Sequence, residues 1–170
     1  MLLRRWRPAD LDPFAAISAD PVVMEHFPAP LTREQSAAFI ERQERSFDAV
    51  GYGLWALEVR REVELGGFVG LVDVEPRLPF APAVEVGWRM ARELWGRGLA
   101  SEAARLALAY AFTELELDEV VSMTAVCNTR SRAVMERIGM QRDVGGDFLH
   151  PALPQGHPLQ PHVLYRLRRR

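Results

Sequence analysis

Apolar and polar positions repeat along this chain with two periods, one of two residues and one near 3.6, which separate strands from helices. The clearest alternation covers residues 83–90, where every second side chain is large and apolar: Val84, Val86, Trp88 and Met90. Such an alternation predicts a strand with two different faces. Apolar stretches of strand length also occur at residues 2–6, 54–59, 68–74, 120–126 and 162–167. The Gly66-Gly67 pair in front of one of them predicts a hairpin turn.

Helical periodicity predicts helices between these strands, over residues 10–19, 32–50, 98–117 and 130–138, with a short one around 23–27. The start of the second helix is the best defined, because Thr32 and Gln35 can form a capping box. Gly139 closes the last helix. Strands that alternate with helices predict an α/β protein, and no linker or internal repeat interrupts the pattern. We therefore expect one domain over residues 1–170.

Composition and charge narrow the function classes. The formal net charge of −2 predicts no strong attraction to nucleic acid or to anionic membranes. No apolar run approaches the roughly 20 residues needed to span a bilayer, and the first six residues are too short for a signal peptide. Cys127 is the only cysteine, so no internal disulfide can form, and we expect a cytoplasmic protein. All 21 basic residues are arginines, which excludes a lysine-based mechanism.

One segment points to chemistry: residues 94–103 read Leu-Trp-Gly-Arg-Gly-Leu-Ala-Ser-Glu-Ala, with Gly96 and Gly98 at the entrance to a predicted helix. Glycines let successive backbone N–H groups point inward, and a helix N-terminus adds unpaired donors. Together they can hold a pyrophosphate without lysine, and Arg97 could add a bidentate contact. A P-loop would need a lysine, and Ser101 stands at the third glycine position of a dinucleotide fingerprint, so both of those motifs fit worse.

The segment resembles motif A of the GNAT superfamily of N-acetyltransferases, a Gln/Arg-x-x-Gly-x-Gly/Ala loop, and its wording is similar to the RimJ/RimL type (ribosomal-protein-alanine N-acetyltransferases). Glu93 stands where the family usually has Gln or Arg. Residues 128–140 resemble motif B of the same family, and residues 84–90 resemble the Glu-Ile-Gly-Tyr strand that precedes motif A. The predicted order of elements, β-α-α-β-β-β-α-β-α-β-β, follows the family over most of the chain.

The resemblance implies a GNAT fold: a mixed, mostly antiparallel central sheet of about seven strands, flanked by helices, with splayed central strands that receive the pantetheine arm. It also implies a reaction, transfer of an acetyl group from acetyl-CoA to a primary amine by direct attack in a ternary complex. The amine belongs to a protein N-terminus or to a small molecule. No metal cofactor is expected.

By the same resemblance, the binding site for acetyl-CoA consists of Trp88, Arg89, Met90, Trp95, Gly96, Arg97, Gly98, Leu99, Ala100, Asn128 and Ser131. Backbone N–H groups of residues 88–90 would polarise the thioester carbonyl. The side chain of Asn128 would bind the pantetheine arm or the thiol region. The simpler alternative is that Asn128 only caps its helix, and the two roles compete for one side chain.

Two residues are candidates for proton transfer. Glu85 is the candidate base, since it occupies a strand position where a core would place a bulky apolar residue; a Glu85–Arg89 ion pair is the alternative. Ser131 is, by resemblance to RimL-type enzymes, the candidate acid that protonates the CoA thiolate, and an ordinary helix-start serine is the alternative. Many GNAT enzymes place a tyrosine four residues later, where this chain has Met135. Weaker base candidates are Asp73, Glu75 and His150.

The acceptor pocket of this fold would be built by residues 27–50 and 145–162, which carry no readable specificity code. His150, His157 and His162 crowd the second stretch, but their spacing matches no metal motif. Two other functions stay open, a CoA-binding regulatory module without catalysis and a transferase for another acyl-CoA such as succinyl-CoA, whose carboxylate Arg89 or Arg130 could bind. A homodimer through a sheet edge also stays open.

Overall fold

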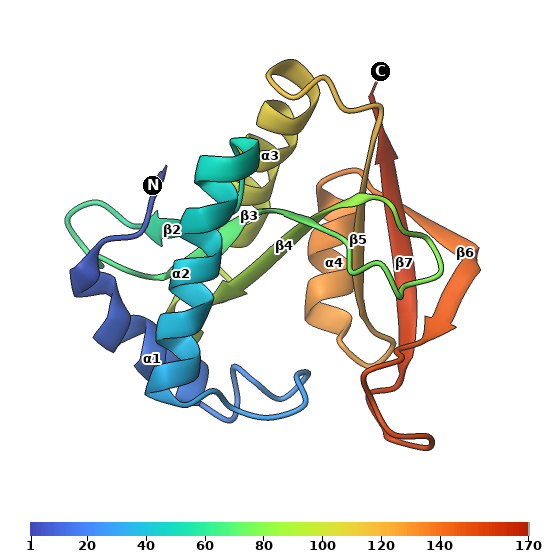
Figure 1. The fold of residues 1–170 in the computed structure, drawn as a ribbon, viewed down its shortest axis with the longest axis horizontal. Helices are drawn as coiled ribbons and strands as arrows, with labels where there is room; N and C mark the ends of the chain where they lie inside the picture. Colours follow the sequence, from blue (N-terminus) through green and yellow to red (C-terminus); the bar gives the residue numbers. More distant parts are fainter. Residues whose placement is uncertain (170) are drawn as a thin grey trace.

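The computed structural model describes residues 1–169, and its seven strands form one sheet with the order β1-β2-β3-β4-β5-β7-β6 (Figure 1). The strands are β1 (Leu2–Arg4), β2 (Leu54–Glu58), β3 (Gly67–Asp73), β4 (Val84–Met90), β5 (Glu119–Ala125), β6 (Gln141–Leu149) and β7 (Pro161–Arg168). Only β4 and β5 are parallel neighbours, and every other pair is antiparallel. The predicted mixed, mostly antiparallel sheet of seven strands is confirmed.

Helices cover both faces of the sheet: α1 (Leu11–Ala19), α2 (Arg33–Val50), α3 (Leu99–Thr113) and α4 (Thr129–Arg137), with short 3-10 turns η1 (Pro8–Asp10) and η2 (Arg92–Leu94). Alternate residues of β2 separate the two layers. Ala56 packs with Phe14 and Phe47 beneath α1 and α2, whereas Leu57 joins the core that contains the alanine-rich side of α3. Figure 1 shows α2 in front of the sheet and α3 behind it. In the described part of the chain, no helix is both long and apolar enough to cross a membrane.

The signals for helix ends are confirmed. The Thr32 side chain accepts a hydrogen bond from the Gln35 backbone, and the Gln35 side chain accepts one from Thr32 in return. Gly51 ends α2 with a φ of 82°, and Gly139 follows α4 with a φ of 91°, both in the left-handed region that favours glycine.

Three local predictions are wrong. Residues 20–27 form hydrogen-bonded turns instead of a helix, because Pro28 and Pro30 disfavour helical conformation just before them. Helix α3 ends at Thr113, not near residue 117, because Glu116 takes a φ of 53° and turns the chain. The β2–β3 hairpin turns at residues 60–62 and not at the Gly66-Gly67 pair.

The centre of the sheet is where the fold creates a site. Strands β3 and β4 pair over seven residues, but β4 and β5 are in register at one pair, Glu85 and Val121. One residue further, the hydroxyl of Ser122 donates to the carbonyl of Val86 over 2.9 Å, and beyond it the strands separate. The predicted splay of the central strands is therefore present.

Candidate active site

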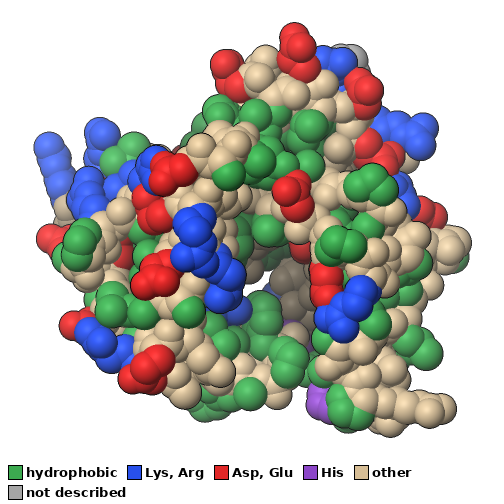
Figure 2. Space-filling model, in the orientation of Figure 1, with side chains coloured by type: hydrophobic (Ala, Val, Ile, Leu, Met, Phe, Trp, Pro, Cys, Tyr) green, Lys and Arg blue, Asp and Glu red, His purple; other side chains and the backbone are tan. Residues whose placement is uncertain are grey.

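A cavity of about 900 Å³ opens where β4 and β5 separate. Figure 2 shows this face of the molecule hollowed at its centre, between the half that contains α2 and the half that contains α4 and β5. Residues from β4, the loop before α3, the start of α4, β5, the segment before α2 and the 150–162 loop line it. Every site residue that the resemblance implies lies on this lining except Arg97.

The side chains of β4 divide the cavity into two sides. Glu85, Gly87 and Arg89 share the face of the sheet that carries α1 and α2, opposite Val72 and Phe68 in the register with β3. Trp88 and Met90 point to the other face and pack on the core that contains α3. The cavity therefore runs through the sheet, and the two groups of residues meet at the backbone of β4.

Glu85 lies at the point where β4 and β5 separate. Its side chain is half-buried and lines the cavity. Burial raises the pKa of Glu85 from 4.5 to about 7, and a backbone hydrogen bond from Met123 opposes that shift. A carboxyl group with a pKa close to neutrality can both accept and release a proton at physiological pH.

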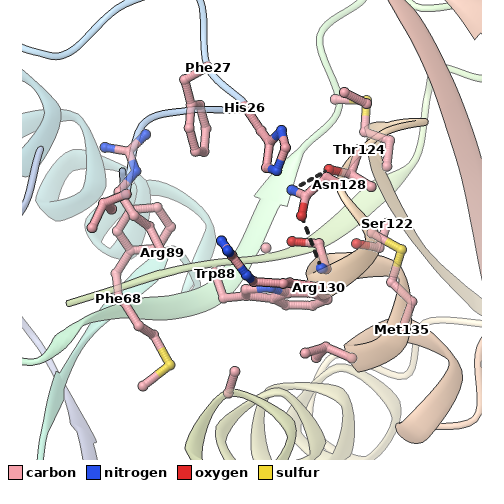
Figure 3. A pocket seen from close by; sticks show the side chains of 18 of the residues that line it. His26, Phe27, Phe68, Trp88, Arg89, Ser122, Thr124, Asn128, Arg130 and Met135 are labelled. Atoms are coloured by element: carbon pink, nitrogen blue, oxygen red, sulfur yellow. Dashed lines mark hydrogen bonds between the residues drawn. The ribbon is translucent and has the colours of Figure 1, made fainter. Parts of the chain in front are cut away.

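The ion pair considered between Glu85 and Arg89 is not formed among the described residues. The guanidinium of Arg89 instead donates from Nη1 to the hydroxyl of Ser18 over 3.2 Å. It also lies over the rings of Phe27 and Phe68, at 4.3 and 5.3 Å from their centroids. Figure 3 shows Arg89 beneath Phe27 on one wall of the cavity. Burial lowers the pKa of Arg89 to about 10, which leaves it protonated at neutral pH.

The loop before α3 has the properties of an anion cradle. Gly96 and Gly98 take φ values of 73° and 79°, and a Cβ at either position would meet nothing within 4 Å. Gly98 begins α3 without a side-chain cap, so the first backbone N–H groups of the helix stay available to a ligand. These observations fit a bound pyrophosphate. Arg97 points elsewhere: its guanidinium pairs with Glu62 over 2.7 Å.

The start of α4 lies against this loop and also lines the cavity. The Asn128 side-chain oxygen accepts from the Ser131 backbone over 3.1 Å, and its amide donates to the Thr124 hydroxyl over 2.9 Å (Figure 3). Asn128 therefore caps its helix in this structure, and both ends of its side chain are occupied. The hydroxyl of Ser131 lines the cavity and makes no hydrogen bond within residues 1–169. Arg130 lies over the Trp95 ring, 4.6 Å from its centroid, and pairs with Glu25 over 2.6 Å.

These elements are the parts of a known architecture, and the acetyltransferase (GNAT) domain family matches residues 1–141. The chain belongs to this family. Among its relatives, YkkB of Bacillus subtilis (strain 168) is 31% identical over 127 residues, which cover 75% of this chain and 73% of YkkB.

Solved GNAT structures superimpose along nearly the whole chain. An acetyltransferase from Agrobacterium tumefaciens str. C58 is 26% identical with a TM-score of 0.77, covering 98% of this chain and 90% of its own. A ribosomal-protein-S5-alanine acetyltransferase from Vibrio fischeri has the same fold, with 17% identity, a TM-score of 0.78 and coverage of 98% and 91%. The resemblance to the GNAT superfamily is confirmed, and the protein is an acyl-CoA-dependent N-acetyltransferase.

Of the other polar residues that the sequence singled out in this GNAT enzyme, some line the cavity and others do not. His150 and His162 line the cavity, and burial lowers the pKa of both imidazoles, whereas His157 lies outside it. Asp73 accepts a hydrogen bond from the Tyr52 hydroxyl, and Glu75 pairs with Arg77, both away from the lining. Residues 1–169 contain no cluster of three or more His, Cys, Asp or Glu placed to hold a metal.

Several residues of the GNAT cavity were not predicted from the sequence, namely His26, Ser122 and Thr124. Ser122 and Thr124 lie at alternate positions of β5, so the polar residues within an otherwise apolar strand were a readable signal. His26 comes from a segment far away in the sequence, just before the predicted acceptor stretch 27–50, and no local pattern places it at the site.

Proposed function

We propose that this enzyme transfers the acetyl group of acetyl-CoA to a primary amine by direct attack in a ternary complex, with Glu85 as base and Ser131 as acid. The observation that supports this most directly is Glu85 itself. It is a carboxyl group with a pKa of about 7, placed where β4 and β5 separate, beside the open backbone of β4. A protonated amine with a pKa between about 8 and 10 must lose a proton before it can attack, and such a group can accept it.

The ammonium group gives one proton to Glu85, and the amine nitrogen attacks the thioester carbonyl carbon, forming the C–N bond. Backbone N–H groups of β4 at residues 88–90 stabilise the oxyanion. The C–S bond then breaks, the thiolate takes the hydroxyl proton of Ser131, and the second amine proton restores that hydroxyl through solvent. The products are an amide, the CoA thiol and one proton released to solvent from Glu85.

Binding of acetyl-CoA is assigned to the other side of the sheet. Gly96, Gly98 and the first turn of α3 would hold the pyrophosphate with backbone N–H groups. Trp88, Met90 and Trp95 would offer apolar contacts to the pantetheine arm between this loop and the gap between β4 and β5. Asn128 would have to give up a hydrogen bond to bind the pantetheine arm, so we assign it first to positioning Ser131.

Calorimetric titration with acetyl-CoA tests this assignment, with NAD and succinyl-CoA as comparisons. Micromolar binding of acetyl-CoA, with no binding of NAD, is expected. Acetyl transfer to a panel of amines and N-terminal peptides then tests the reaction, with the thiol product measured directly. A folded protein that binds no CoA ligand would contradict the assignment of the cradle, and binding without transfer to any amine would favour the regulatory module.

A further inference from the structure

Arg89 is the most unusual group in the cavity, because it is a buried cation without an anion. Its exposed fraction is 8%, and within residues 1–169 it makes no ion pair. Its one hydrogen bond goes to the neutral hydroxyl of Ser18, at 3.2 Å, and its Nε has no partner. Removing a charge from water is unfavourable unless a partner compensates, and contacts with two aromatic rings compensate only in part.

The acidic side chains that line the cavity do not supply this partner. Glu25 is bonded to Arg130 and lies within 3.3 Å of His26, on the wall formed by the segment before α2. Glu85 is on the same face as Arg89 but four residues away along the strand, about 13 Å between Cα atoms for an extended chain. The guanidinium is therefore protonated, buried and open to whatever occupies the cavity.

The strand leaves space between these two charged groups. Gly87 lies between them on the same face, its φ is not positive, and a Cβ there would meet nothing closer than Leu54 at 4.0 Å. Neither backbone conformation nor crowding requires a glycine at this position. The missing side chain leaves free space in the cavity about 7 Å from Arg89 along the strand, next to the place where the amine is proposed to attack the thioester.

We propose that Arg89 binds a carboxylate of the acceptor, so that the substrate is a small amine that also carries a carboxylate. That the substrate is an amine depends on the function proposed above, whereas the presence of a carboxylate is inferred from Arg89 alone. The side of the sheet decides between acceptor and acyl donor. Arg89 faces α1 and α2 with Phe27 and Phe68, whereas the cradle for the donor lies at the start of α3. The aromatic rings around Arg89 suit an acceptor that also has an apolar part.

The test is calorimetric binding to protein saturated with CoA, so that its result does not depend on turnover. The probes are two matched pairs that differ by the carboxylate alone: L-phenylalanine with phenethylamine, and 6-aminohexanoate with pentylamine. At least one carboxylate probe is expected to bind about 10- to 100-fold more tightly than its partner, as for a hydrogen-bonded ion pair. Equal affinity within both pairs would overturn the proposal.

Variants separate binding by the guanidinium from a structural role. Arg89→Gln is expected to reduce the preference for the carboxylate to less than about threefold, and Arg89→Lys to keep part of it. Arg130→Gln is the matched control, because Arg130 also lines the cavity but is already paired with Glu25, and it is expected to keep the full preference. If Arg89→Gln weakened both members of a pair by the same factor, Arg89 would only hold the Phe27 segment in place and the proposal would fail.

These titrations, together with an acetylation assay on the same amines, distinguish this proposal from the proposed function. Acetylation of phenethylamine with no preference for carboxylates would leave the acetyl transfer intact and overturn the role of Arg89. Carboxylate-dependent binding without acetyl transfer would support Arg89 and count against the function of the site as a catalyst. Tighter binding of succinyl-CoA than acetyl-CoA, lost in Arg89→Gln, would assign the guanidinium to the acyl donor and overturn its assignment to the acceptor.

Discussion

The two edges of β4 differ more than any other pair of regions in this molecule. On one edge, β4 pairs with β3 over seven residues, and the backbones approach so closely that Gly67 has no room for a side chain. On the other edge, β4 meets β5 at one registered pair and leaves its remaining backbone open to a cavity. One strand thus belongs to the stable sheet along one edge and to the proposed site along the other.

The open edge can bind a ligand because its backbone groups are not all hydrogen-bonded to a neighbouring strand. A fully paired strand has no free N–H group to offer a substrate, because each one is bonded to its neighbour. Changes at the closed edge should therefore reduce stability and changes at the open edge should reduce activity.

The largest effect is expected for Glu85→Gln, which removes the proposed base and should lower the rate by about 100- to 10,000-fold near pH 8. In the wild type, the rate should fall as the pH drops below about 7 and Glu85 becomes protonated, and the variant should lose this limb. At a pH above the pKa of the amine, the deficit should shrink because the amine is already neutral. Steady-state rates from pH 5 to pH 10 measure this.

Glu75→Gln is the matched control for this change, since Glu75 is also an acid near the end of β3 but pairs with Arg77 outside the cavity. It should keep the wild-type rate and pH profile. A pH profile of Glu85→Gln that still bends near 7 would assign the titration to another group.

At the closed edge, Gly67→Ala should lower the free energy of unfolding by about 3 kcal/mol, through backbone strain and crowding. Its φ is 126°, and a Cβ would lie 2.1 Å from the carbonyl oxygen of Arg89. Gly87→Ala on the open face is the control and should change stability by less than about 1 kcal/mol, in the stabilising direction. Urea unfolding compares the two. Equal midpoints would contradict the division between the edges of β4.

At the cradle, Gly98→Val should weaken binding of acetyl-CoA by about 100-fold, because a branched side chain would occupy the space of the phosphates and disfavour the φ of 79°. The strain alone should reduce stability by only about 1–2 kcal/mol. Calorimetry on the folded variant measures the affinity. Unchanged affinity would show that the loop serves the fold and not the ligand.

The smallest effect is expected for Ser131→Ala, which should lower turnover by about tenfold because CoA thiolate is a good leaving group even without an acid. The affinity for acetyl-CoA should stay within a few-fold, since the cap from Asn128 is made to the backbone and is retained. Parallel rate and binding measurements check this. A loss of affinity equal to the loss of rate would make Ser131 a binding residue.

The order of elements, the capping box at Thr32 and the glycine turn at Gly96 and Gly98 in front of α3 could be predicted because each depends on neighbours in the sequence. The environment of Arg89 could not be predicted from the sequence. Its surroundings combine Ser18, Phe27 and Phe68, which come from three separate segments. The side chain of Arg97 was equally unreadable, because Glu62 on the β2–β3 turn draws it away from the cavity. Local sequence patterns thus predicted which backbone segments line the cavity. Long-range contacts determine that the guanidinium of Arg89 faces the cavity and that of Arg97 does not.

The burial of Glu85 has a consequence for how this enzyme tolerates heat and acidity. Because the pKa rises from 4.5 in the unfolded chain to about 7, folding takes up a proton between these values. The contribution of this residue to stability therefore declines as the pH rises through that window, by about 3 kcal/mol in total. A glutamine at this position would not lose stability in this way, because its side chain does not ionise. At and above neutral pH, Glu85→Gln should therefore raise the free energy of unfolding, whatever it does to the rate.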